Sequence, residues 1–135
     1  MAGISAFGAF IPRLRLSRKS VVEANAWFNS GLGGMAKGER AMCNWDEDSV
    51  TMAVAAARDC LAGEDRGALK GVQLASNTMP FADRQNSTLI ATALNLDDNI
   101  STLDLTASQR VGTSGLAAAL EAMFGSAGGP LLFLA

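Results

Sequence analysis

The sequence predicts an α/β protein built on a mostly parallel sheet, and three observations lead to this fold class. Apolar segments of strand length alternate with stretches of helical periodicity, in the order β-α-α-β-α-β-α-β. The helical stretches are long enough to carry the chain back to the start of a neighbouring parallel strand. The strand segments are almost continuously apolar, as expected when helices cover both faces of a sheet.

The first predicted strand and helix lie before residue 31. Residues 3–11 are rich in aliphatic and aromatic side chains and stop at Pro12, which is typical of a buried strand. A helix is predicted from Ser17, ending at Asn29-Ser30-Gly31. Its apolar positions share one face and are Val21, Val22, Ala24, Trp27 and Phe28. The glycine-rich stretch 31–44 is expected to be a loop.

A second helix is predicted from Ser49 to Gly63, after the acidic run Asp46-Glu47-Asp48. Negative charge is favourable at a helix N-terminus, so the run indicates helix capping more than a metal site, which would need further ligands. Cys60 lies on an alanine-rich face of this helix and is expected to fill space as a small hydrophobic residue. Cys43 is expected in a polar loop.

The second half of the chain alternates strands and helices. Residues 71–76 form the second predicted strand, and 77–80 a turn that ends at a proline. A helix over 84–94, a strand over 100–105, a helix over 112–124, a turn over 126–129 and a strand over 130–135 complete the order. Leu116, Ala119, Leu120 and Met123 share one face of the last helix, and Gly112 and Gly115 would let it pack closely. A sheet ending on such a strand has an unpaired edge, so we expect residues 1–135 to be part of a larger functional unit.

Composition excludes several classes of function. The net charge is −2 without a basic run, which disfavours nucleic acid as a partner. The apolar end 130–135 is far shorter than the about 20 residues that span a bilayer, and no basic residue precedes the apolar N-terminus, so neither a membrane anchor nor a signal peptide is expected. We therefore expect a cytoplasmic protein. The chain has no histidine, and its two cysteines lack metal-site spacing, so a Ser/His/Asp triad and a metal site are not expected.

The junction of the third predicted strand with the last helix is the strongest candidate site. The strand breaks at Ser108-Gln109-Arg110 into the start of a helix, where unpaired backbone N–H groups and the helix dipole stabilise negative charge. A cysteine at such a position becomes a thiolate nucleophile. This chain has Gln109.

Four segments together resemble the N-terminal half of the thiolase superfamily, and within it hydroxymethylglutaryl-CoA synthase and its homologues, relatives of the ketoacyl synthase III enzymes. The segments are GISAFGAFIPRLRL, NWDEDSVTMAVAAARDCL, SNTMPFADR and DLTASQRVGTSGL. The resemblance implies a duplicated, layered αβα fold with a central helix and a reactive cysteine at its start. It further implies transfer of an acyl group from acyl-CoA or an acyl-carrier thioester, a homodimer, no cofactor besides that substrate, and a C-terminal half that supplies a histidine.

Two positions depart from the family pattern. Gln109 stands where the resemblance places the cysteine, and a carboxamide cannot form a thioester. Asn77 stands where it places a general acid/base glutamate, and an amide cannot exchange the proton. The resemblance therefore implies an acyl-CoA-handling condensing enzyme or acyltransferase in which Gln109 orients the thioester carbonyl and Asn77 holds the second substrate. The alternatives are a thioester decarboxylase, or a non-catalytic half that binds substrate or a partner such as an OB-fold or zinc-ribbon acyl-CoA-binding protein.

Three basic residues are candidates for binding the CoA phosphates or a carboxylate. Arg110 lies beside Gln109, and its alternative is a salt bridge to Asp104 or Asp83. Lys37 and Arg40 would belong to a glycine-rich lid over the CoA-binding mouth, with Trp45 packed beneath it. The alternative for this segment is a solvated loop.

Overall fold

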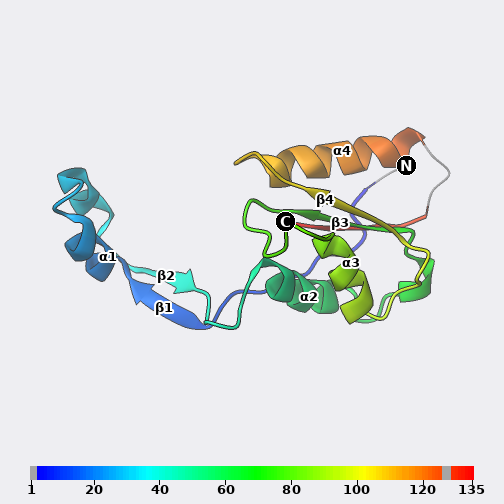
Figure 1. Ribbon diagram of the computed structural model, residues 1–135, viewed down its shortest axis with the longest axis horizontal. Coiled ribbons are helices and arrows are strands. Elements are labelled where there is room, and N and C mark those ends of the chain that lie inside the picture. Colours follow the sequence, from blue (N-terminus) through cyan, green and yellow to red (C-terminus); the bar gives the residue numbers. More distant parts are fainter. Residues whose placement is uncertain (1–2, 126–128) are drawn as a thin grey trace. The chain divides into compact units, whose positions relative to one another are not determined.

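The computed structural model describes residues 3–125 and 129–135, so the predicted turn at 126–129 lies largely outside the described residues. The chain forms two compact units, one made of Met1–Phe10 with Asp48–Ala135 and the other of Ile11–Glu47. Their elements are labelled in Figure 1. None of the helices in the described ranges is both long and apolar enough to cross a membrane.

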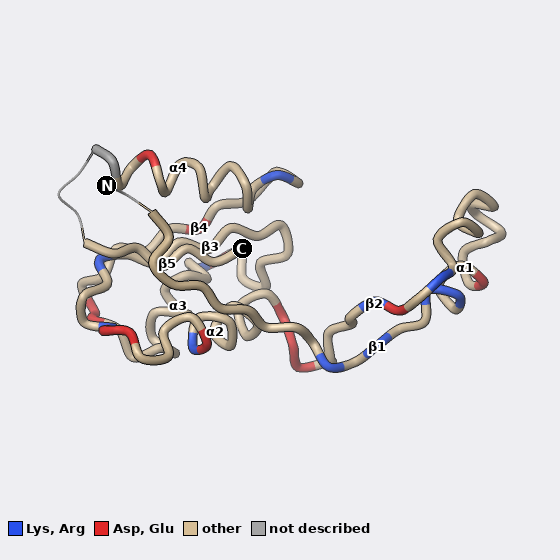
Figure 2. Tube along the Cα trace, turned by 180° about the vertical axis from the view of Figure 1, so that it is seen from behind, with Lys and Arg blue, Asp and Glu red and all other residues tan. Residues whose placement is uncertain are grey.

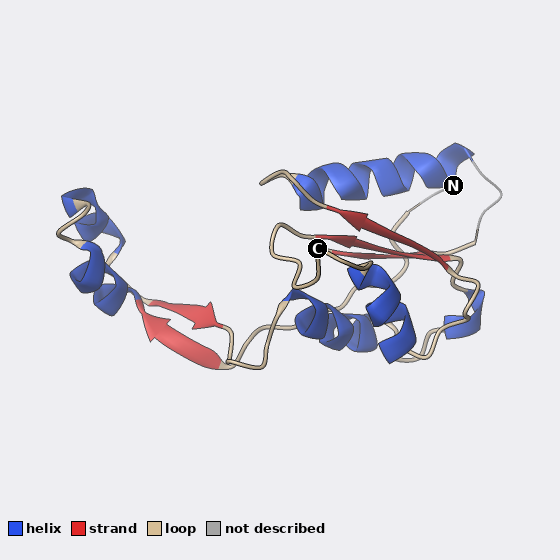
Figure 3. Ribbon diagram, viewed as in Figure 1, coloured by secondary structure: helices blue, strands red, loops and turns tan. Residues whose placement is uncertain are grey.

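The larger unit is a parallel three-stranded sheet between helices, which confirms the predicted fold class. Its strands are β3 (Gly71–Ala75), β4 (Ser101–Leu105) and β5 (Leu131–Leu134), in the order β4-β3-β5. The helices α2 (Ser49–Cys60) and α3 (Asn86–Ala93) cover one face, and α4 (Val111–Gly125) covers the other (Figures 1 and 3). A short 3-10 helix, η2 (Arg66–Ala68), precedes β3.

The core of this unit lies between the sheet, α2 and α3. Val72 and Ile90 are fully buried, while Leu74 and Leu94 are 1–2% exposed. Only one strand of the sheet carries a charged residue, Asp104 on β4, so the strands are almost entirely tan in Figure 2. The absence of charge on β3 and β5 fits the prediction that both faces of the sheet are covered.

Helix α2 begins where the acidic run predicted. Asp48 Oδ1 accepts a hydrogen bond from Thr51 N at 2.8 Å, and Thr51 Oγ1 accepts one from Asp48 N at 2.8 Å. This reciprocal capping box satisfies two of the N–H groups that a helix start leaves unpaired. The capping interpretation of the acidic run is therefore confirmed, at least for Asp48.

Helix α4 lies close to the sheet because two of its residues are glycines. A Cβ at Gly115 would lie 2.9 Å from Leu105 Cδ1 and 3.0 Å from Phe133 Cε2. A Cβ at Gly112 would lie 3.2 Å from Ala135 Cβ. The predicted packing role of both glycines is confirmed.

The first predicted strand is wrong. Residues 3–10 belong to no ladder and instead run along α2, where a Cβ at Gly8 would collide with the backbone of Ala56 and Cys60. Ala9 N donates to Asp59 Oδ2 at 3.0 Å. An apolar segment becomes a strand only if a neighbouring strand edge is within reach, and these contacts hold the segment against a helix.

The smaller unit also differs from the prediction. The stretch 31–44 is not a loop, because it contains the 3-10 helix η1 (Ser30–Met35) and the strand β2 (Glu39–Met42). Strand β2 pairs antiparallel with β1 (Leu14–Ser17), with Leu14 opposite Met42. The predicted helix exists but is shorter, since α1 spans Arg18–Asn25 and leaves Trp27 and Phe28 beyond its end, 86% and 77% exposed. Polar side chains on both strands concealed this hairpin in the sequence.

Candidate functional site

The connections of the sheet open a crevice at the carboxyl ends of β3 and β4. The chain leaves β3 toward α3 on one face and leaves β4 toward α4 on the other (Figure 3). Where two neighbouring strands send their connections to opposite faces, the loops diverge, and open α/β sheets bind ligands at such points. The loops that follow Ala75 and Leu105 therefore define the candidate site.

A depression of about 280 Å³ lies at this point. It is lined by Asn77, Thr106, Ala107, Ser108 and Gln109. The structure thus brings the two predicted site residues, Asn77 and Gln109, to one depression, although they are 32 positions apart in the chain. Both side chains are exposed. The lining holds amides and hydroxyls and no charged group, so it suits a neutral polar function such as a carbonyl.

The loop from β4 to α4 presents Gln109 at the start of the helix. Ala107 has a φ of +73°, in the left-handed region that L-residues seldom adopt. Ser108 then holds the turn, because its Oγ accepts from Arg110 N at 3.1 Å and its carbonyl oxygen accepts from Val111 N at 3.1 Å. Backbone strain of this kind is concentrated at functional sites. Sequence analysis placed Ser108 at this junction, which is called the elbow below, but did not identify Thr106 and Ala107 as lining residues; the break between strand and helix was the only signal for them.

The loop after β3 is fixed on both sides of Asn77. Ser76 N donates to the carbonyl oxygen of Leu105 at 3.0 Å, which ties this loop to β4. Ser76 Oγ accepts from Thr78 N at 3.2 Å, and Ser49 Oγ donates to the carbonyl oxygen of Thr78 at 2.8 Å. The backbone around Asn77 is therefore held by α2 and β4 while its side chain faces the depression.

Asp104 anchors the next helix. Its Oδ2 accepts from Asn86 N at 2.6 Å and Asn86 Nδ2 at 3.0 Å, and its Oδ1 accepts from Ser87 N at 2.8 Å. Partial burial raises the pKa of this carboxyl, but the hydrogen bonds from Ser87 and Asn86 outweigh it and hold the pKa below its ordinary value. Asp104, a residue of β4, thus caps the N-terminus of α3 although it is 18 residues further along the chain than Asn86.

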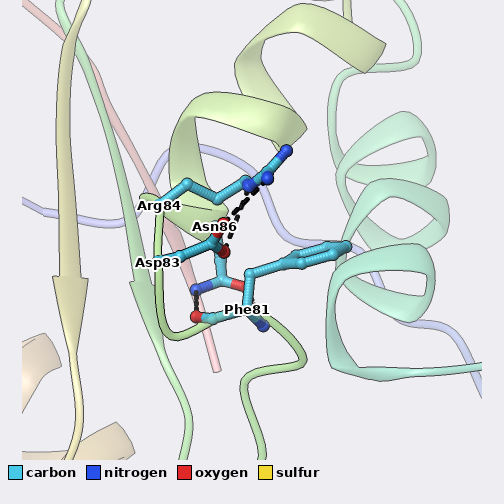
Figure 4. Close-up of polar contacts among 4 residues, drawn as sticks. All are labelled: Phe81, Asp83, Arg84 and Asn86. Atoms are coloured by element: carbon cyan, nitrogen blue, oxygen red, sulfur yellow. Dashed lines mark hydrogen bonds and ion pairs between the residues drawn. The ribbon is translucent and has the colours of Figure 1, made fainter.

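The loop before α3 is a second polar cluster (Figure 4). The Asn86 side chain bonds both backbone groups of Phe81, accepting from its N at 3.2 Å and donating to its carbonyl oxygen at 2.9 Å. Arg84 pairs with Asp83 at 2.8 Å and lies over the Phe81 ring, 5.5 Å from its centroid. The Arg84 guanidinium lowers the pKa of the exposed Asp83 carboxyl.

These contacts exclude the alternative prediction for Arg110, a salt bridge to Asp104 or Asp83. Asp83 is paired with Arg84, and Asp104 is bound by Asn86 and Ser87, so neither forms the predicted salt bridge with Arg110 in the described part of the chain. Arg110 is exposed and directly follows Gln109. Its predicted role in binding an anion stays a prediction.

The other predicted binding residues lie in the smaller unit. Lys37 follows η1, and Arg40 lies on β2 opposite Leu16. Both are exposed. Trp45 is 93% exposed, so the expectation that it packs beneath a lid is wrong, because no apolar surface covers its ring. Gln109 belongs to the larger unit, so the predicted binding role of Lys37 and Arg40 stays a prediction.

Neither cysteine lines the depression. Cys60 lies on α2, partly buried against the core as predicted. Burial raises the pKa of its thiol, and the nearby Glu64 and Asp59 raise it further. A raised pKa reduces the thiolate fraction at neutral pH, so Cys60 is not an activated nucleophile. Cys43 is exposed in the smaller unit.

Comparison with known proteins finds curated relatives that are named hydroxymethylglutaryl-CoA synthase. The chain is 33% identical over 122 residues to hydroxymethylglutaryl-CoA synthase of Methanocaldococcus jannaschii, and 30% identical over 121 residues to that of Aeropyrum pernix. The alignments cover 86% and 88% of this chain but only 34% of each relative. The chain thus spans about a third of the length of the curated relatives it matches. No family model matches it.

Solved structures show the same fold. The 3-oxoacyl-(acyl carrier protein) synthase III of Pseudomonas aeruginosa superimposes with a TM-score of 0.77 at 23% identity, over 98% of this chain and 40% of that one. The priming β-ketosynthase of the R1128 polyketide pathway gives a TM-score of 0.70 at 27% identity, over 87% and 36%. The chain therefore has the thiolase-like fold, and its sequence relates it to part of hydroxymethylglutaryl-CoA synthase, as the four segments predicted.

Proposed function

We propose that this chain forms the N-terminal, thioester-binding half of an acyl-CoA-handling condensing enzyme or acyltransferase of the hydroxymethylglutaryl-CoA synthase-like class. The observation that carries the proposal is the depression that Asn77 and Gln109 line together at the carboxyl ends of β3 and β4. The thioester of acyl-CoA or of an acyl carrier protein lies in this depression. Its carbonyl oxygen points to the start of α4.

Gln109 acts in this proposal as a hydrogen-bond donor. Its side-chain amide carries two N–H groups, and the first N–H groups of α4 lie next to it in the chain. Donors placed where an oxyanion develops each contribute roughly 10²–10³ in rate. Asn77 supplies a second amide from the opposite loop and holds the second substrate.

The lining also indicates which reaction Gln109 supports. A depression without a cysteine, histidine or carboxylate holds no thiol nucleophile and no general base that would activate the hydroxyls of Thr106 and Ser108 for acyl transfer. Loss of carbon dioxide from a carboxylated thioester breaks one carbon–carbon bond and leaves an enolate, whose oxygen must be stabilised until its carbon takes a proton from water. We therefore favour thioester decarboxylation among the candidate reactions, with condensation requiring groups from outside residues 1–135.

A non-catalytic role is the second candidate, and the same uncharged lining favours it. In that case the chain binds an acyl thioester, or a partner such as an acyl-CoA-binding protein, without turnover. Arg110 would meet a CoA phosphate, and Lys37 and Arg40 would contribute further positive charge. The complete protein acts as a homodimer in the cytoplasm under both candidates.

Binding of malonyl-CoA and release of carbon dioxide separate these candidates. Isothermal titration of the chain with malonyl-CoA is expected to show Gln109→Ala and Asn77→Ala weakening binding about 2–10-fold each, the loss of one net hydrogen bond. Asn99→Ala is the matched control, because Asn99 is an exposed amide in the turn at the opposite end of β4. Equal affinity of all three variants and the parent chain would contradict the proposed site.

Turnover decides between catalysis and binding alone. If the chain is a decarboxylase, Gln109→Ala lowers the rate of carbon dioxide release by roughly 10²–10³ while Asn99→Ala leaves it unchanged. Binding that depends on Gln109 without carbon dioxide release supports the non-catalytic role.

A further inference from the structure

The loop between β3 and α3 is tied to β4 at both of its ends. Its residues, 76–85, form neither helix nor strand. Where the loop begins, Ser76 N donates to the carbonyl oxygen of Leu105 at 3.0 Å. Where it ends, Asn86 N donates to the carboxylate of Asp104 at 2.6 Å. Two consecutive residues of one strand thus hold both ends of the loop, and its path between them depends on further contacts.

The Asn86 side chain reaches back into this loop and holds Phe81 (Figure 4). Its Oδ1 accepts from Phe81 N at 3.2 Å, and its Nδ2 donates to the carbonyl oxygen of Phe81 at 2.9 Å. The same Nδ2 donates to Asp104 Oδ2 at 3.0 Å, and the residue is 1% exposed. Both N–H groups and the carbonyl oxygen are therefore used inside the protein. A carboxylate at this position would lack the donors, and an alkyl side chain would lack all three groups.

Capping of α3 does not require the contacts with Phe81. The backbone N–H groups of Asn86 and Ser87 bind the Asp104 carboxylate, and any residue except proline would supply them. A buried polar side chain whose groups are all satisfied makes the segment it joins rigid and specifies one conformation. The two bonds from the Asn86 carboxamide to Phe81 therefore serve the loop more than the helix.

We propose that Asn86 is a positioning residue for Asn77. By holding Phe81, four residues after Asn77, it fixes the path of the loop from which the Asn77 amide faces the depression. The proposal rests on the proposed function, in which Asn77 holds the second substrate. Site residues need neighbouring contacts that hold them within about 0.5 Å of the productive geometry. The bond from Ser49 to Thr78 holds the loop on one side of this path, and Asn86 holds it on the other.

Nuclear magnetic resonance of the isotope-labelled full chain tests whether Asn86 places Asn77. The variant is Asn86→Ala. The control is Ile90→Val, because Ile90 is fully buried one turn further along α3 and the change removes packing without removing a hydrogen bond. The side-chain NH2 signals of Asn77 are expected to shift or broaden in Asn86→Ala and to keep their positions in Ile90→Val.

Binding of malonyl-CoA tests whether this placement matters at the site. Asn86→Ala is expected to weaken binding about 2–10-fold, as Asn77→Ala does. In a chain that already carries Asn77→Ala, it should weaken binding by less than about twofold, because the residue that it places is gone. In a chain that carries Gln109→Ala, the full effect should remain. A general loss of stability would act alike in all three backgrounds, and Ile90→Val should leave the affinity unchanged.

Asp104→Asn is the second variant if Asn86→Ala does not fold. It keeps one acceptor oxygen, so it loosens Asn86 more mildly, and the same Asn77 signals should shift. The proposal is overturned if these signals are unchanged in the variant that folds, or if Asn86→Ala weakens binding equally with and without the Asn77 amide. If neither Asn77→Ala nor Gln109→Ala changes the affinity for malonyl-CoA, the proposed function fails, and the Asn77 signals alone decide whether Asn86 places Asn77.

Discussion

Replacement of Asp104 by asparagine is expected to destabilise the larger unit by about 1–2 kcal/mol. The Asp104 carboxylate accepts three hydrogen bonds, two from Asn86 and one from Ser87, at 2.6–3.0 Å. Two of these come from the first backbone N–H groups of α3, so Asp104 acts as the cap that Gln85, at the N-cap position, does not provide with its own side chain. Loss of an N-cap costs about 0.5–2 kcal/mol, and a hydrogen bond to a charged group contributes about 1.5–3 kcal/mol. An asparagine at position 104 retains one acceptor oxygen, so only part of this stabilising free energy is lost.

The dependence on pH follows from the lowered pKa of Asp104. Because the folded-state pKa lies below that of the unfolded chain, about 3.9, the contribution is fully present above that pH and disappears as pH falls through the folded value. The stability difference between the parent chain and Asp104→Asn should therefore be constant near pH 7 and should shrink below about pH 4.

Urea unfolding followed by circular dichroism from pH 7 to pH 2.5 measures both effects. Asp97→Asn is the matched control, because Asp97 also accepts two hydrogen bonds, both from Asn99, but in an exposed turn. We expect this control to cost less than about 0.5 kcal/mol. The reasoning is refuted if the two variants are equally stable, or if the loss caused by Asp104→Asn is the same at pH 7 and at pH 2.5.

Three further substitutions test the packing, the strained elbow and the helix cap. Gly115→Val should destabilise by about 1–3 kcal/mol in urea unfolding, because its side chain would meet Leu105 and Phe133, whereas Gly33→Val, with open space around Gly33, should show no such packing loss. Ala107→Gly should raise the free energy of unfolding by about 0.5–1 kcal/mol, since glycine adopts the φ of +73° without strain; a decrease would contradict the strain. Asp48→Ala should lower the thermal midpoint, through a loss of about 1 kcal/mol from the α2 capping box, and Asp46→Ala, two residues earlier, should leave it nearly unchanged.

The candidate site was partly predictable. The elbow at Gln109 and the turn at Asn77 each follow an apolar strand, so the sequence and its family resemblance pointed to both residues. Their meeting at one depression depends on β3 and β4 being neighbours that send their loops to opposite faces. That arrangement also explains why Thr106, Ala107 and Ser108 line the depression. It explains why Asp104 accepts hydrogen bonds from the start of α3 and forms no salt bridge with Arg110.

The sequence by itself determined the local elements of the larger unit and their parallel, layered class. The signals for these elements act over a few residues, so they can be recognised from the sequence. They are the continuous apolar strands, the helical periodicity, the cap before α2 and the two glycines of α4. Only the tertiary structure decided three features: residues 3–11 form no strand, β1 and β2 pair as a hairpin, and β5 lies at one edge of its sheet. Strand pairing joins residues far apart in the chain, and whether an extended segment finds a partner depends on which edge lies within reach.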